Sequence, residues 1–132
     1  MLRDVARRIA LSAPEGVYVA RLGGDEFLAV MSGAAELGAL AAAEAFIAGI
    51  EDLGATLTRF PLSASIGIAI GAGTESAEQL LHRADQAMYR AKAVGPGRCE
   101  FARPADAAVV PPAVGPSVGP SRAGFGGPIP VR

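Results

Sequence analysis

Apolar residues follow two different periods along the first 102 positions of the chain. Spacings of three and four residues predict helices over 2–13, 34–53 and 75–95. Alternating or β-branched runs predict strands over 16–22, 26–32, 62–70 and 98–102. The linker between the first two strands is short enough for a hairpin. The order helix, hairpin, helix, strand, helix, strand predicts an α+β domain, with an antiparallel sheet covered by helices.

The strand over 62–70 has two contrasting faces. Its even-numbered positions are bulky, with Ile66 and Ile68 at the centre, whereas the odd-numbered positions are as small as Gly67. The small face would allow a helix to approach closely. In the helix that follows, Ser76 is expected as the N-cap and Gly95 as the C-cap.

The chain opens on a helix that needs a sheet to pack against, and no strand precedes it. We therefore expect the first strand or strands of the sheet to be missing. Such a gap would expose apolar sheet residues such as Ile66 and Ile68 and leave the chain marginally folded.

Residues 103–132 differ in composition from residues 1–102. They hold seven of the ten prolines and five of the glycines. That composition is typical of a disordered segment, and it opposes both a regular helix and a central strand. We therefore predict one ordered domain over 1–102 and a disordered Pro/Gly/Ala-rich tail over 103–132 that is dispensable for the fold.

Composition excludes several classes of protein. The net charge of -1 provides no basic field for nucleic-acid binding. Cys99 is the single cysteine, which excludes an intramolecular disulfide and a multi-cysteine zinc site. No apolar run is long enough to span a bilayer, and charges interrupt the N-terminal segment, which is unlike a signal peptide. The expectation is a soluble, cytoplasmic chain without membrane or nucleic-acid partners.

The hairpin is the candidate site of chemistry. Gly23 and Gly24 precede two adjacent carboxylates, Asp25 and Glu26, between two apolar runs. Mg²⁺ prefers oxygen ligands and takes only one or two from protein when phosphate and water supply the rest. Glycines would let a nucleotide approach the backbone. The pattern is consistent with phosphoryl or nucleotidyl transfer, while the alternative is a plain turn with solvated acids.

Three motifs together resemble one family. They are RLGGDEF (21–27), LSASIGIAI (62–70) and ADQAMYRAKAVGPGR (84–98), in the family's order. Over roughly residues 1–102 the chain resembles the GGDEF domains of bacterial diguanylate cyclases. The resemblance implies a fold like the palm of nucleotidyl cyclases, with a ferredoxin-like core. It also implies the condensation of two GTP molecules, one on each protomer of an antiparallel homodimer, to cyclic di-GMP and two pyrophosphates.

The resemblance also assigns roles to residues of the hairpin and the last helix. Gly23 and Gly24 would admit the nucleotide, and Asp25 would ligate Mg²⁺ or Mn²⁺. Glu26 would assist the metal or the proton transfer. Lys92, the one lysine, would reach the triphosphate, although most lysines at such a position are simply solvated. Arg21 would orient the hairpin or serve a purely structural role.

The sequence departs from the family in three places. The upstream motif D-x-D-x-F-K-x-x-N-D-x-x-G-H, which supplies a second metal-binding Asp and the guanine contacts, is not in these 132 residues. Pro96 takes the place of a phosphate-contacting arginine. Pro14 and Val17 replace the Arg and Asp of the product-inhibition motif, so no inhibitory site is expected.

These departures predict a chain that is inactive as it stands. The intact protein would synthesise cyclic di-GMP and carry an upstream sensory domain. The alternative is a non-catalytic GGDEF module that binds GTP or a partner protein for regulation.

Overall fold

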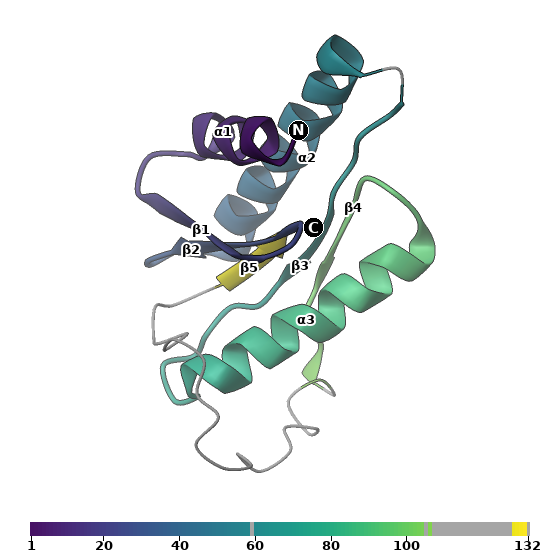
Figure 1. The fold of residues 1–132 in the computed structure, drawn as a ribbon. Helices are drawn as coiled ribbons and strands as arrows, with labels where there is room; N and C mark the ends of the chain where they lie inside the picture. The colour runs from purple at the N-terminus through teal and green to yellow at the C-terminus, as the bar shows by residue number, and fades with distance from the viewer. Residues whose placement is uncertain (59, 105, 107–127, 132) are drawn as a thin grey trace.

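The computed structural model describes residues 1–58, 60–104, 106 and 128–131, which form a five-stranded sheet with helices on both faces (Figure 1). The helices are α1 (Leu2–Ser12), α2 (Glu36–Leu57) and α3 (Ala77–Val94). The strands are β1 (Val17–Gly23), β2 (Glu26–Met31), β3 (Ser65–Ile68), β4 (Arg98–Phe101) and β5 (Pro128–Val131), in the order β1-β2-β5-β3-β4. Helices α1 and α2 cover one face of the sheet, and α3 covers the other.

The sheet is antiparallel except at one pair. β1, β2, β5 and β3 alternate in direction, whereas β3 and β4 run parallel. The predicted α+β class, with an antiparallel sheet covered by helices, is confirmed, and the one parallel pair is β3 with β4. The exception follows from connectivity, because α3 lies between β3 and β4 and a helical crossover joins parallel strands.

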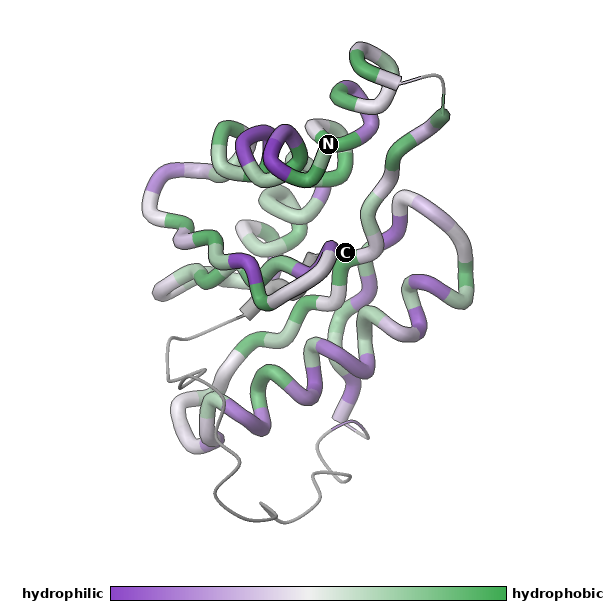
Figure 2. Tube along the Cα trace, viewed as in Figure 1, coloured by the Kyte–Doolittle hydropathy of each residue, from purple (hydrophilic) through white to green (hydrophobic). Residues whose placement is uncertain are grey.

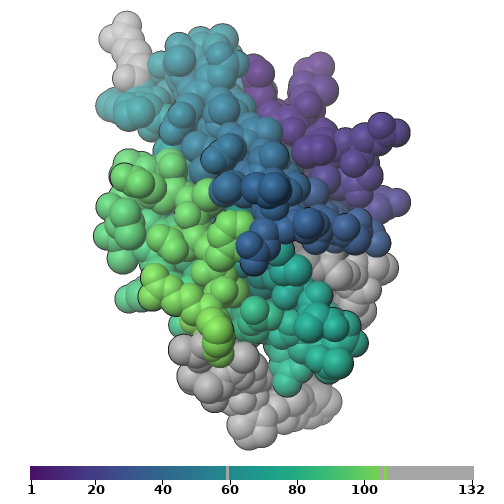
Figure 3. Space-filling view, turned by 180° about the vertical axis from the view of Figure 1, so that it is seen from behind, coloured from purple at the N-terminus to yellow at the C-terminus, as the bar shows by residue number. Residues whose placement is uncertain are grey.

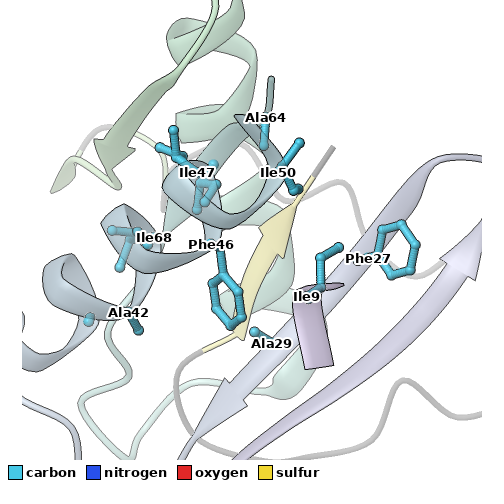
Figure 4. Close-up of a cluster of buried hydrophobic side chains, with 12 residues drawn as sticks. Ile9, Phe27, Ala29, Ala42, Phe46, Ile47, Ile50, Ala64 and Ile68 are labelled. Carbon is cyan, nitrogen blue, oxygen red and sulfur yellow. The ribbon is translucent and has the colours of Figure 1, made fainter. Parts of the chain in front are cut away.

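The main core lies between the sheet and the α1–α2 layer (Figure 4). Phe46 of α2 points toward the sheet near Ala29 of β2, and both side chains are fully buried. Ile9 of α1 lies in the same cluster. Seen from behind, α2 runs between α1 and the part of the chain around β4 (Figure 3).

Strand β3 is buried on both faces. Ile66 and Ile68 join the core under α2, whereas Gly67 and Ala69 face α3. A Cβ at Gly67 would lie only 1.9 Å from the carbonyl oxygen of Ala84, so the helix packs directly on the strand backbone. The two-faced pattern predicted for this segment is confirmed.

The expected exposure of Ile66 and Ile68 is contradicted. Both side chains are buried, at 0% and 1% exposed. The reason is that α2 covers their face of the sheet and β5 lies beside β3 in the position where a gap was expected.

Helix α3 begins and ends where the sequence indicates. The Ser76 hydroxyl accepts a hydrogen bond from the backbone N–H of Gln79, and the Gln79 side chain accepts one from the backbone N–H of Ser76. Gly95 forms the C-cap with φ +146°. Along the helix, hydrophilic and hydrophobic residues alternate (Figure 2), as expected for an element with one solvated side.

The segment after residue 102 differs from its prediction at two points. Asp106 is buried and makes a bidentate ion pair with Arg90, at 2.6 and 2.9 Å. Residues 128–131 form β5 inside the sheet, where the proline-rich composition argued against a central strand. The prediction relied on local composition. Composition does not show whether the sheet formed by other segments has an open position that an extended segment can fill. The rest of the predicted disordered tail lies outside the described residues, and its disorder stays a prediction.

No helix among the described residues is long and apolar enough to cross a membrane.

Candidate active site at the β1–β2 turn

The turn between β1 and β2 depends on two glycines with positive φ. Gly23 has φ +152° and Gly24 has φ +54°, conformations that residues with a side chain rarely adopt. The pairing register shifts between Arg21 and Gly23, so the strand bulges just before the turn. The Arg21 Nε–H donates to the carbonyl oxygen of Gly24 at 2.9 Å. Arg21 therefore orients the hairpin, as one of its two predicted roles requires.

The two carboxylates at the turn have different surroundings. Asp25 is exposed at the tip, whereas Glu26 begins β2 and is half-buried. Phe27, the next residue, is 2% exposed and fixes the start of the strand in the core. A Cβ at Gly23 or Gly24 would meet no atom within 4 Å, so space is open beside the backbone that precedes the acids.

A cavity of about 290 Å³ opens beside Asp25. Its walls come from α1, α2, the start of β2 and the segment before β3. They are mostly apolar, and Asp25 and Ser63 contribute the side-chain oxygens. The lining residues are Met1, Leu2, Val5, Ile9, Asp25, Phe27, Ile50, Leu62 and Ser63. An apolar hollow with few polar groups at its rim is the usual form of a small-molecule site.

Strand directions bring Lys92 to the same edge of the sheet as the turn. β2, β3 and β4 all run in one direction, and Phe27, Ile66 and Cys99 lie in one row across the sheet through β5. The residues that precede each strand therefore share one edge. Three strand spacings separate β2 from β4, about 15 Å. Lys92 lies in the last turn of α3, just before β4, and is exposed.

The loop between α3 and β4 contacts the segment that lines the cavity. A Cβ at Gly97 would lie 3.2 Å from Ser63 Oγ and 2.8 Å from Glu51 Oε1. The Ser63 hydroxyl donates to Glu51 Oε1 at 3.4 Å. Ser63 thus connects the Lys92 side of the edge with the cavity beside Asp25.

The oxygen ligands at the turn suit a hard divalent cation that phosphate also holds. The described residues include no cluster of three or more His, Cys, Asp or Glu side chains arranged for a metal. Mg²⁺ at nucleotide sites ordinarily takes one or two carboxylates from protein, and Asp25 and Glu26 are the residues at the turn that could hold it. Cys99 is a poor candidate ligand, because burial raises the pKa of its thiol and favours the protonated form.

Comparison with known proteins places this fold and turn in one family. The family model described as "Diguanylate cyclase, GGDEF domain" matches residues 1–98. The chain therefore belongs to the GGDEF domain family, which confirms the resemblance found in the sequence. The GGDEF domain of YfiN (or TpbB) from Pseudomonas aeruginosa superposes with a TM-score of 0.64 at 34% identity, over 77% of this chain and 66% of that one.

Curated relatives are longer proteins. Diguanylate cyclase DosC of Escherichia coli K12 is 36% identical over 104 residues, which are 76% of this chain and 23% of the relative. Diguanylate cyclase DgcP of Pseudomonas aeruginosa is 32% identical, over 77% of this chain and 16% of the relative. Signaling protein YkoW of Bacillus subtilis is 36% identical, over 70% of this chain and 12% of the relative. The chain thus spans less than a quarter of the length of each of these proteins.

The structure keeps the predicted site residues at one edge of the sheet and adds a cavity and Ser63 beside them. Gly23, Gly24, Asp25 and Glu26 stay together because they are contiguous, and Lys92 shares their edge of the sheet. The catalytic and binding roles of these five residues stay predictions. Sequence reasoning missed the cavity and Ser63, because four separate segments form the walls and no local pattern marks them.

Proposed function

We propose that this chain is the GTP- and metal-binding portion of a diguanylate cyclase that makes cyclic di-GMP when joined to an upstream segment. The observation that carries the proposal is the turn itself. An exposed Asp25 stands beside a half-buried Glu26, with open space along two glycines and a cavity next to the aspartate.

Asp25 would hold Mg²⁺ or Mn²⁺, and Glu26 would support that site or accept a proton. A bound divalent ion offsets the negative charge that develops on phosphate during nucleotidyl transfer. The open backbone at Gly23 and Gly24 would let the triphosphate approach. Lys92, on the same edge of the sheet, would pair with its outer phosphates.

Each 3′-hydroxyl would attack the α-phosphate of the GTP held by the opposite protomer, with loss of pyrophosphate. The upstream motif, to which the resemblance assigns a second metal-binding Asp and the guanine contacts, is not among these 132 residues, so we expect the chain to form no product alone. An upstream sensory domain and a homodimer belong to the same proposal. The other candidate, a regulatory module that binds GTP without turnover, is separated from it by the experiment below.

The test is a chimaera in which this chain replaces the matching segment of the Escherichia coli relative. The chimaera should convert GTP to cyclic di-GMP, and the free chain should not. Asp25→Ala should lower turnover about 100- to 1000-fold, the usual cost of losing one electrostatic contact to the transition state. Stability should change by no more than about 0.5 kcal/mol, because the side chain is exposed.

Glu15→Ala is the matched control, since Glu15 is an exposed carboxylate before β1, at the opposite end of the hairpin. It should leave both turnover and the melting temperature unchanged. GTP binding by the chimaera without product would support the regulatory module instead. Turnover of Asp25→Ala within tenfold of the parent would return the turn to a purely structural role.

A further inference from the structure

A second cavity, of about 490 Å³, lies between the end of α2 and the segment before β3, and we call it the α2 cleft. The chain turns after α2 and returns along the helix toward β3 (Figure 1). The returning segment packs directly on the helix, because a Cβ at Gly54 would lie 2.7 Å from the backbone N of Leu62. The walls are mainly apolar and include Phe60, Pro61 and Pro96. A cavity of this size and lining is typical of a small-molecule site.

The turn at the mouth of the α2 cleft is fixed by Thr58. Its hydroxyl donates to the carbonyl oxygen of Gly54 at 3.1 Å and accepts from the backbone N–H of Phe60 at 3.2 Å. The backbone N–H of Thr58 donates to the same carbonyl oxygen, also at 3.1 Å. These bonds hold the backbone of Phe60, while its side chain is 77% exposed. An aromatic ring therefore lines the cleft with much of its surface open to a ligand.

The α2 cleft offers negative charge and few hydrogen-bond donors. Within the part of the chain that the structure describes, Glu51 is the one charged residue of the lining, and no ion pair is formed by it there. The C-terminal end of α2 adds partial negative charge, with no basic residue in the last turn. Pro61 and Pro96 have no N–H, and the hydroxyls of Thr58 and Ser63 already donate to protein oxygens. The lining thus favours a cation over an anion.

The shape of the lining indicates which kind of cation fits. Apolar walls suit a ligand with an apolar body, and the face of an aromatic ring such as Phe60 attracts a cation placed over it. A planar, delocalised cation is more weakly hydrated than an ammonium ion and forms directed hydrogen bonds to a carboxylate. Glu51 accepts only one long hydrogen bond, from the Ser63 hydroxyl at 3.4 Å, so its oxygens have acceptor capacity left for such a ligand.

We propose that the α2 cleft binds a small aromatic cation of the amidinium or guanidinium class, with Glu51 as its counter-ion and Phe60 against its flat face. Leu62 and Ser63 line both this cleft and the cavity beside Asp25, so the ligand would contact the segment that separates the two. The proposal concerns a site of its own and holds whether or not the chain takes part in cyclisation.

The first test titrates the full chain with benzamidine and follows the backbone amide signals by NMR. Benzamidine should give saturable shifts at Gly54, Leu62 and Gly97, which surround Glu51 and the returning segment. Benzamide, its neutral counterpart of the same shape, should bind about tenfold more weakly, because it loses the charge-assisted hydrogen bond. Equal affinity for the two compounds, or no shifts at these residues, would overturn the proposal.

Glu51→Gln should weaken benzamidine binding about fivefold, as expected for an ion pair near the surface, and leave the melting temperature unchanged. Phe60→Ala should weaken it by a similar factor through loss of the ring. Glu44→Gln is the matched control, because Glu44 is an exposed acid two turns earlier in α2 and outside the lining. It should bind as the parent does. Equal losses in Glu51→Gln and Glu44→Gln would overturn a specific site.

Two further arms separate the proposed ligand from other guanidinium groups. Arg59 precedes Phe60 in the sequence, and Arg59→Ala should bind benzamidine at least as tightly as the parent, since it removes a competing positive charge. Weaker binding by this variant would overturn the electrostatic basis. Acetyl-arginine amide, which represents an arginine side chain of another protein, should bind more weakly than benzamidine because it has no aromatic body. Tighter binding of acetyl-arginine amide would overturn the assignment to a small aromatic ligand.

Discussion

Gly67 shows how much one residue decides in this fold. It lies in β3 directly beneath α3, and its missing side chain lets the helix backbone approach the strand. The atoms that a Cβ would meet include the carbonyl oxygen of Ala84 at 1.9 Å and the N of Met88 at 2.4 Å. These are backbone atoms, which move only if the helix moves as a whole.

Gly67→Ala should therefore destabilise the domain by about 3 kcal/mol, at the upper end of ordinary overpacking costs. Gly38→Ala is the matched control, because Gly38 lies in α2 with nothing within 4 Å of its Cβ position. That change should stabilise the domain by about 0.5 kcal/mol, since alanine is the better helix former. Urea unfolding of both variants measures the difference. Equal effects would mean that α3 can shift away from β3.

At the scale of elements, the three helices differ in how they begin. α3 has a capping box formed by Ser76 and Gln79. The N-caps of α1 and α2 are Met1 and Ala35, and neither helix has a side-chain hydrogen bond at its cap. Their starts depend on packing, because Ile9 and Phe46 are fully buried in the shared core. The start of α3 thus depends on local chemistry, and the starts of the other two on tertiary contacts.

Ser76→Ala should cost about 1 kcal/mol, because the backbone N–H of Gln79 loses its acceptor. The measurement is chemical denaturation, with exchange of the first-turn amides of α3 as a local readout. Ser32→Ala, at an exposed serine in the loop before α2, should change neither. Faster exchange throughout α3, instead of in its first turn alone, would contradict a local cap.

At the scale of the whole molecule, one ion pair connects Asp106 to α3. Both carboxylate oxygens of Asp106 accept hydrogen bonds from Arg90 of α3, and one also accepts from the backbone N–H of Arg103. The Arg90 guanidinium is the main cause of the lowered pKa of Asp106, which lies below its ordinary 3.8. The pair holds Arg103 and Asp106 against α3.

The pH dependence follows from the direction of that shift. The folded state binds the Asp106 proton less tightly than the unfolded state, so this group contributes its full stability above about pH 5. The contribution is lost as the pH falls through the ordinary value toward the lowered one. Asp106→Asn should cost about 2 kcal/mol at pH 7 and flatten the acid side of the stability profile.

Asp52→Asn is the matched control, since Asp52 pairs with Arg8 at 3.1 Å on the surface and is 64% exposed. Exposed pairs contribute little, so its profile should follow that of the parent within about 0.5 kcal/mol. Thermal unfolding between pH 3 and pH 7 tests both variants. Identical acid slopes for Asp106→Asn and the parent would show that the pair does not govern the profile.

The sequence by itself determined the local features of this protein. Short-range patterns predicted α1, α2, α3 and four of the strands, because apolar period and capping residues act within a few positions. The contiguous residues 23–26 predicted the turn, and three motifs together identified the family. The small face of β3 predicted the close approach of α3.

Only the tertiary structure decided how distant segments meet. The parallel pairing of β3 with β4, the cavity beside Asp25 and the shared edge of Asp25 and Lys92 follow from strand order and direction. The burial of Asp106 and the strand at 128–131 opposed the local composition. Local propensity reports what a segment prefers alone, whereas backbone groups in a sheet need partners that any extended segment of the chain provides.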